Sequence, residues 1–297
     1  MPKIEPLLRP SALIFYVDFT LSVLVGNALL WLASGQEAWS LIQIAYTIAA
    51  ALALFRATVF MHEISHAAKK LKGFELYYNL LHGFLHKVPS YNYNSHRYHH
   101  IPRTYGTAED PEYDILADRP IIFNFFLYPF IFMFLTPLFL LVRWGVLPFF
   151  LPFMGEKARM WVFTYMSTLA CHVPYRRPAP TDAEKKEWYA QDAGCAIYSL
   201  ATLALIAAGI LPWSILVIWY LMVYMLVIMN SFRTLMNHRY LTGYSASSHK
   251  QQVIDSITLP LTVFNNLFFP LGLSYHGLHH MFPQVPYHNM RKIHNIF

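Results

Sequence analysis

Charged residues and cysteines are scarce in this chain. Only 13% of its 297 residues are charged and 56% are hydrophobic, whereas a soluble domain is about 25% charged. The two cysteines, Cys171 and Cys195, are too few for a disulfide framework and neither lies in a C-x-x-C motif, so we expect free thiols. This composition excludes a disulfide-stapled secreted domain and indicates an integral membrane protein.

Two further features are missing. No small-residue cleavage site follows the first apolar run, so we expect no removable signal peptide. The formal charge is +6, but the basic residues are dispersed between apolar segments and form no surface typical of nucleic-acid recognition. We therefore expect a membrane face, and no nucleic acid, as the partner of this charge.

Long apolar runs are abundant and predict helices that cross a membrane, because about 20 apolar residues span about 30 Å of hydrocarbon. Four principal spans are predicted, in two hairpins: 12–33, 39–61, 196–210 and 212–232. Prolines and Arg143 interrupt the run 120–153, which fits a further hairpin, a re-entrant segment or interfacial helices. We expect the run 253–274, broken by polar residues and prolines, to be interfacial or packed against the core.

Lysine and arginine are unequally distributed between the two sides of this layout. The predicted outer turns, Ser34–Ala38 and Gly209–Trp213, contain neither residue, so the other side, where the basic residues gather, is predicted to be cytoplasmic. We expect one domain over 1–297, with 62–195 and 233–297 cytoplasmic or interfacial. The polar stretch 176–191 is predicted to be a solvated loop.

Histidine is clustered at three places in the sequence. The clusters are MHEISH at 61–66, SHRYHH at 95–100 and YHGLHH at 275–280, and the last two share the spacing H-x-x-H-H. Residues three or four apart lie on one face of a helix, so His276 can converge with His279 or His280 on a metal. A lone histidine in an apolar chain is more often structural, but a repeated spacing favours ligation.

The candidate metal ligands are the eight histidines of these clusters and one that follows a long apolar run. They are His62, His66, His96, His99, His100, His238, His276, His279 and His280. Neutral imidazole suits iron, zinc, copper or nickel, and nine imidazoles exceed what one ion can coordinate. The count therefore favours two metal ions.

These boxes, in this order and between apolar spans, resemble the HxxxH, HxxHH and HxxHH boxes of the membrane fatty acid desaturase and hydroxylase superfamily. Bacterial members of this superfamily have similar sequences around the second and third boxes, which here read HRYHHIPRTYGTAEDPEYD and PLGLSYHGLHHMFPQVPYHNMRKIH. The resemblance covers about residues 61–294. It implies an all-α integral membrane fold with about four transmembrane helices, interfacial helices and a cytoplasmic, histidine-rich di-iron cap. It also implies two non-haem iron ions, O2 as co-substrate and a multi-pass location in a bacterial inner membrane.

The function implied by this resemblance is O2-dependent desaturation of a fatty acyl chain. Hydroxylation or ketolation of a lipid, carotenoid or alkane is the alternative, since both outcomes begin with the same C–H abstraction. Electrons would come from a separate protein of ferredoxin, rubredoxin or cytochrome type. The superfamily often places an extra iron ligand where His238 stands, but the asparagine that some members carry one turn earlier is Thr234 here.

Other polar residues near the boxes have supporting roles in this interpretation. Five carboxylates could orient the ligands through hydrogen bonds, with capping or surface charge as the alternative: Glu63, Asp110, Glu112, Asp114 and Asp255. His82, His86, His288 and His294 are expected to be structural, interfacial or hydrogen-bonded to ligands. No signal attaches to His172 or His249.

Residues 62–66 also match a competing motif, H-E-x-x-H, which is the signature of zinc metalloproteases. That interpretation uses one metal and leaves both H-x-x-H-H clusters and His238 without a purpose. A non-catalytic metal-binding membrane protein is the remaining alternative.

Overall fold

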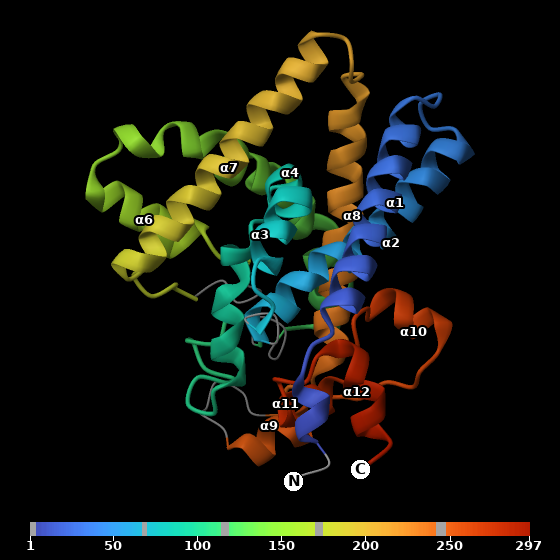
Figure 1. The fold of residues 1–297 in the computed structure, drawn as a ribbon, viewed down its shortest axis with the longest axis vertical. Coiled ribbons are helices and arrows are strands. Elements are labelled where there is room, and N and C mark those ends of the chain that lie inside the picture. The colour runs from blue at the N-terminus through green and yellow to red at the C-terminus, as the bar shows by residue number, and fades with distance from the viewer. Residues whose placement is uncertain (1–3, 67–69, 114–118, 170–174, 242–247) are drawn as a thin grey trace.

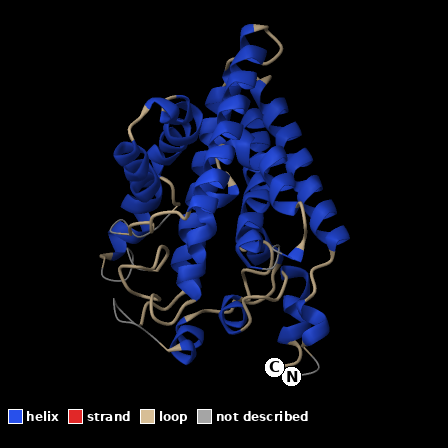
Figure 2. Cartoon of the chain, turned by 60° about the vertical axis from the view of Figure 1, so that its left-hand side comes forward, coloured by secondary structure: helices blue, strands red, loops and turns tan. Residues whose placement is uncertain are grey.

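Two antiparallel hairpins of long helices form the upper part of the molecule in the computed structural model (Figure 1). Helices α1 (Ala12–Ser34) and α2 (Leu41–His66) make one, and α7 (Asp182–Ala207) and α8 (Ser214–Asn237) make the other. The structure describes residues 4–66, 70–113, 119–169, 175–241 and 248–297, and within these ranges it contains helices and no β-strand (Figure 2). The predicted all-α membrane fold is confirmed.

Five helical stretches of the described chain, where four were predicted, are long and apolar enough to cross a membrane. The fifth is Phe123–Phe149, whose prolines remove backbone donors and interrupt regular α-helical hydrogen bonding. Its pieces are η5 (Phe123–Phe132), η6 (Met133–Leu135), α5 (Thr136–Leu140), η7 (Leu141–Val146) and η8 (Leu147–Phe149), and η9 (Leu151–Phe153) and α6 (Glu156–Met166) follow it. The stretch 62–195 is therefore not wholly extramembrane by this measure.

Helix α7 begins at Asp182, so the prediction of a solvated loop over 176–191 is wrong for its second half. Thr181 and Glu184 form a capping box, in which each side chain binds the other residue's backbone N–H and starts the helix. Trp188 and Gln191 in this first part are buried. The high charge of the stretch thus belongs to the exposed face of a helix.

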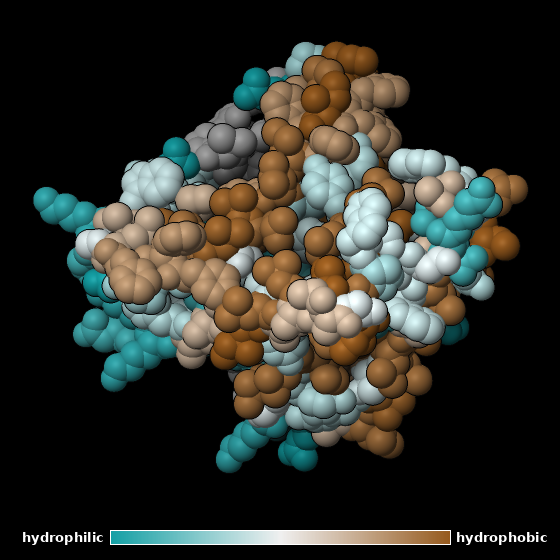
Figure 3. Space-filling view, turned by 90° about the horizontal axis from the view of Figure 1, so that it is seen from above, coloured by the Kyte–Doolittle hydropathy of each residue, from teal (hydrophilic) through white to brown (hydrophobic). Residues whose placement is uncertain are grey.

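Helices α1 and α2 approach closely at Gly26. A Cβ at this position would lie 2.5 Å from the side chain of Leu54, so the contact depends on glycine. Apolar side chains on the other faces are exposed, among them Leu13, Leu24 and Leu41. Seen from the end where α7 meets α8, hydrophobic side chains cover much of the surface and strongly hydrophilic ones lie at its edge (Figure 3). This distribution suits contact with lipid tails.

A buried ion pair ties the fifth stretch to α7. Arg143 is fully buried and its guanidinium lies 3.1 Å from the carboxylate of Asp192. The same guanidinium donates to the hydroxyls of Tyr91 at 2.7 Å and Ser167 at 2.8 Å. The charge that made 120–153 ambiguous in the sequence is therefore compensated inside the protein.

A bent helical segment between α2 and the fifth stretch leads into the second histidine box. It consists of α3 (Phe74–Tyr78), η3 (Asn79–Gly83), α4 (Phe84–His86) and the 3₁₀-helix η4 (Ser90–His100). Lys87 turns the chain between α4 and η4 with a left-handed backbone (φ 64°), and its amine donates to the Phe84 carbonyl at 3.0 Å. The turn directs η4 toward the lower end of α2.

Short helices close the lower end, where both termini lie (Figure 1). They are η1 (Glu5–Leu8), α9 (His249–Asp255), α10 (Val263–Phe268), α11 (His276–Met281) and α12 (Tyr287–His294). The run 253–274 contains only the end of α9 and α10, so it provides no candidate span, as predicted.

Candidate metal centre

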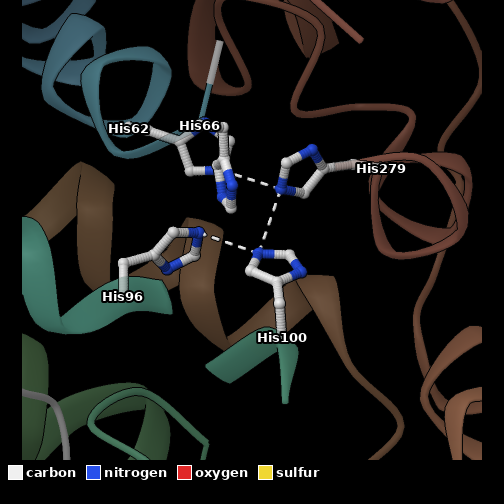
Figure 4. A group of neighbouring side chains, drawn as sticks. All are labelled: His62, His66, His96, His100 and His279. Atoms are coloured by element: carbon white, nitrogen blue, oxygen red, sulfur yellow. Dashed lines mark hydrogen bonds between the residues drawn. The ribbon is translucent and has the colours of Figure 1, made fainter. Parts of the chain in front are cut away.

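Five of the predicted ligands gather at the lower end of α2. This set, which we call group A, is His62, His66, His96, His100 and His279. The five rings come from α2, η4 and α11 and face a common point (Figure 4). The Nε2 atom of His279 lies 3.0 Å from that of His62 and 3.1 Å from that of His100.

The other four predicted ligands gather beside group A. This set, which we call group B, is His99, His238, His276 and His280, and all four are buried. The Nε2 atom of His276 lies 2.9 Å from that of His238 and 3.1 Å from that of His280. In each group one nitrogen per ring lies within 4.8 Å of all the others. The structure thus brings together all nine residues, in two sets.

The two H-x-x-H-H boxes divide between the groups in opposite ways. From η4, His96 and His100 enter group A and His99 enters group B; from α11, His276 and His280 enter group B and His279 enters group A. In the α-helix α11, residues four apart share a face and the middle histidine leans to the neighbouring face. In the 3₁₀-helix η4, residues three apart eclipse, so spacing alone does not explain its division. Each box nevertheless bridges the two groups.

The donor geometry fits a metal ion in each group. Two nitrogen ligands at right angles, each about 2.1 Å from an ion, lie about 3.0 Å apart, whereas a tetrahedral ion would separate them by about 3.4 Å. The observed contacts of 2.9 to 3.1 Å match the first value. His276 Nε2 offers one in-plane lone pair or one hydrogen, which cannot form two well-directed hydrogen bonds to the two nitrogens that it faces, whereas both contacts are expected around a shared ion.

The protonation of these rings also suits ligation. Burial, reinforced by neighbouring imidazoles, lowers the pKa of His100, His279 and His280 well below the usual range. A neutral imidazole keeps the lone pair that a metal requires. These three rings are thus neutral nitrogen donors.

Carboxylates orient one histidine in each group. In group A, Glu112 accepts a hydrogen bond from His96 Nδ1 at 2.6 Å. In group B, Asp110 lies 3.0 Å from His99 Nδ1, and its carboxylate raises the pKa of His99 although burial opposes this. Asp110 is itself held by the backbone N–H groups of Gly106 and Glu112. A proton on Nδ1 leaves Nε2 free to bind metal.

His238 is oriented by two residues. The Tyr105 hydroxyl lies 3.0 Å from His238 Nδ1 and donates to Asp255 at 2.6 Å. Asp255 lies 3.5 Å from the same nitrogen and also accepts from the Leu241 backbone at 2.7 Å. The sequence analysis proposed Asp255 but not Tyr105. Tyr105 lies in the stretch RTYGT after the second histidine box and belongs to no recognisable motif.

The remaining two proposed carboxylates differ. Glu63 lies 3.8 Å from His62 Nδ1, too far for a hydrogen bond, and instead accepts from the Tyr287 backbone at 3.2 Å. Asp114 lies outside the described residues. Glu63 therefore fastens α12 to α2 and orients no ligand directly.

None of the other described histidines belongs to either group. His288 accepts from the Ser11 backbone at 3.0 Å and the His294 ring packs on Tyr275, so both serve the terminal packing. His249 is exposed, and His172 lies outside the described residues. His82 and His86 lie in the wall of a cavity.

That cavity has a volume of about 280 Å³ and borders group A through His62. Its wall is mostly apolar, with side chains such as Phe55 on α2, Leu140 on α5 and Val223 on α8. Arg233, near the lower end of α8, also lines it and was not singled out from the sequence. An apolar cavity that reaches a ligand histidine offers room for a hydrocarbon chain.

The zinc protease interpretation fits this geometry poorly. His62 and His66 do share a group, but three further histidines join them, and zinc in proteins almost always takes four ligands in total. Glu63 faces the backbone of α12, as described above.

The fold and the paired histidine groups define a multi-pass membrane protein with two histidine clusters that could each hold a metal ion. Residues 37–297 match the fatty acid desaturase family, and the chain belongs to this family. It is thus an oxidoreductase of the desaturase and hydroxylase superfamily, as the boxes predicted. Ligation by the nine histidines remains a prediction.

One curated relative covers nearly the whole chain. The chain is 31% identical over 301 residues to the ceramide hydroxylase of Caulobacter vibrioides (strain NA1000 / CB15N). The aligned region covers 99% of this chain and 83% of that protein. No solved structure gives a significant match.

Proposed function

We propose that this protein uses O2 to hydroxylate a C–H bond of a long-chain, membrane-embedded lipid. The observation that carries the proposal is the convergence of two all-histidine groups at the end of an apolar cavity. The relative that matches 99% of the chain favours hydroxylation, and its name makes an amide-linked lipid of the ceramide type the first substrate to test.

The overall reaction consumes one O2 and two electrons. A lipid C–H bond, O2, two electrons and two protons give a lipid C–OH bond and one water. A bound pair of iron ions would supply the O2-activating redox chemistry, with groups A and B as their ligands. A separate electron-donor protein of ferredoxin, rubredoxin or cytochrome type would deliver the electrons to this centre.

The protein itself orients the histidines and encloses the lipid chain. Asp110, Glu112 and Asp255 hold their histidines with Nε2 toward the metal positions. The cavity wall keeps water from the lipid chain and positions it beside group A. The basic residues favour a cytoplasmic location for this end of the molecule, in a bacterial inner membrane.

Desaturation is the second candidate, because the matched family is named for it. That reaction removes two hydrogens from adjacent carbons and gives two waters from the same O2, electrons and protons. The outcome depends on how closely a second hydrogen approaches the oxidant, since reacting atoms must be held about 3 to 3.5 Å apart.

Expression in a host that lacks the activity, followed by mass spectrometry of extracted lipids, tests the proposal. We expect a lipid that gains one oxygen atom, and no product with His276→Ala. A lipid that loses two hydrogens without gaining oxygen would favour desaturation. Unchanged lipids from cells whose purified protein carries two irons would contradict both.

A further inference from the structure

Arg233 is a buried cation in the wall of the cavity. It is 6% exposed and lies near the lower end of α8, where it borders the same space as His62. Its guanidinium donates to the Asn230 side chain at 3.1 Å and more weakly to the Thr234 hydroxyl at 3.5 Å. No carboxylate of the described residues lies within ion-pair distance of it.

Such a position is costly for a guanidinium unless acceptors surround it. Arginine carries five N–H donors and stays charged, and a buried charge that lacks partners is strongly destabilising. Two neutral side-chain oxygens satisfy only part of this capacity. The Glu112 carboxylate also lines the cavity but accepts from His96 at 2.6 Å, so an occupant of the cavity would supply a further acceptor.

His82 presents the opposite chemistry in the same wall. The Thr58 hydroxyl donates to the Leu54 carbonyl at 2.8 Å, so the contact of 2.8 Å between Thr58 and His82 Nε2 requires Nε2–H as donor. A neutral His82 therefore has an acceptor at Nδ1, and this buried atom has no protein partner among the described residues.

His86 follows the same logic. The Asn27 amide N–H donates to the Val23 carbonyl at 2.9 Å, which leaves the Asn27 oxygen to accept from His86 Nε2 at 3.2 Å. Its Nδ1 is likewise a buried acceptor without a partner in the described chain. The two rings lie 4.7 Å apart between centroids and form one acceptor pair.

The donor and the acceptor pair occupy different levels of the cavity. Thr58, which holds His82, precedes His62 by four residues on α2, a rise of about 6 Å along the helix axis. Arg233 lies near the lower end of α8, five residues before His238 of group B, and lines the cavity together with His62. Apolar side chains such as Phe55 and Val223 line the space between and beyond.

We propose that Arg233 and the pair His82 and His86 determine specificity by binding polar groups that the lipid carries inside the cavity. Arg233 binds a substrate oxygen, a carbonyl or hydroxyl, near the reacting carbon, and the pair accepts hydrogen bonds from a substrate hydroxyl or amide N–H. A lipid with both kinds of group, such as an N-acylated long-chain base, fits this pattern. A wax ester or a free fatty acid anion lacks the donors.

This inference rests on the proposed lipid oxidation but is tested by binding. Iron-loaded protein in detergent is titrated with radiolabelled N-palmitoyl-sphinganine, palmityl palmitate and palmitate. We expect the amide-linked lipid to bind roughly 10- to 100-fold more tightly than the wax ester, the range for one or two hydrogen bonds to charged or buried groups. Equal affinities for all three lipids, or tightest binding of palmitate, would overturn the inference.

Variants assign the effect to the residues. Arg233→Met should weaken binding of N-palmitoyl-sphinganine and of palmityl palmitate about tenfold or more, because both lipids carry a carbonyl oxygen, and Arg233→Lys should recover part of the loss. His82→Phe removes both ring nitrogens while Thr58 still donates to the Leu54 carbonyl, so it should reduce the preference for N-palmitoyl-sphinganine over palmityl palmitate. Arg103→Met, which changes an exposed arginine, is the matched control.

The two proposals fail in different ways. If Arg233→Met loses no lipid affinity and His82→Phe loses no lipid preference while the cells still oxidise lipids, the polar groups of the cavity bind only water and this inference is wrong. If no lipid is oxidised although N-palmitoyl-sphinganine binds as expected, the proposed reaction is wrong and the binding site stands. Iron content and helical circular dichroism of each variant verify folding, and the lipid comparison on the unmodified protein remains decisive if a variant does not fold.

Discussion

Group A has five histidines and borders the cavity, whereas group B has four, of which two contact orienting side chains. In group B, Asp110 orients His99, and Tyr105 with Asp255 orients His238. In group A, Glu112 orients only His96 among the contacts described above. In both groups some Nδ1 atoms have no hydrogen bond, among them those of His62 and His276. Of the nine histidines, His62 alone is part of the described cavity wall.

The comparison suggests a division of labour between two sites of similar donors. Hydrogen-bonded carboxylates fix the ring orientation and raise the basicity of a ligand, so group B is organised for firm binding. Group A has more ligands with fewer supports and lies where a lipid chain would arrive. We therefore expect changes in group A to alter the reaction with substrate, and changes around group B to alter metal retention first.

The largest effect is expected from removing a ligand of either group. His62→Ala and His276→Ala each delete a nitrogen donor and should lower activity by at least about 100-fold, above the range for partners that only orient a ligand. Product formation per expressed protein measures this. His249→Ala, at an exposed position, should retain nearly full activity. Substantial activity in either ligand variant would remove that histidine from its group.

The His238→Ala variant tests whether the two groups bind metal independently. It leaves group B with three histidines and group A intact, so we expect the protein to lose about half of its bound metal and essentially all activity. Metal analysis of the purified variant, beside the unmodified protein, measures the loss. Full iron content with full turnover would show that His238 is not a ligand.

The supporting carboxylates should produce the next smaller effects. Asp110→Asn is expected to weaken metal binding in group B, and Glu112→Gln in group A, each by about 10- to 100-fold. Competition with a chelator, followed by spectroscopy of the retained iron, reports which group is depleted. Identical depletion patterns in the two variants would argue against two independent metal positions.

Tyr105→Phe should have the smallest effect of this series. It removes one hydroxyl that bridges His238 and Asp255 but leaves both residues in place. A lost hydrogen bond of this kind corresponds to a few-fold change in metal affinity. The chelator titration used for Asp110→Asn measures it, and a loss as large as that of His238→Ala would make Tyr105 more than an orienting residue.

Much of this centre was predictable because its information is local. The H-x-x-H-H spacing keeps the histidines of a box close together, and the nine candidate ligands do converge in the structure, while their ligation of metal stays a prediction. The division of each box between the groups was not predictable, because spacing allowed His276 to pair with either His279 or His280. That choice depends on how α11 sits against η4 and α8.

The fold was predictable where apolar length decides and less so where polar residues are compensated by distant partners. Arg143 and the prolines obscured the fifth candidate span, since the partner Asp192 is 49 positions away. The first turns of α7 looked like a loop because charge outweighed the Thr181 and Glu184 capping signal. Arg233, His82 and His86 acquired meaning only when the fold placed them in one cavity wall.

Elemental analysis of protein purified after iron-replete expression tests the central claim most directly. Nine histidines in two groups predict two irons per chain, and the His238→Ala variant should retain about one. A preparation of the unmodified protein with one zinc and no iron would contradict the paired metal centre and return the H-E-x-x-H motif at 62–66 to consideration.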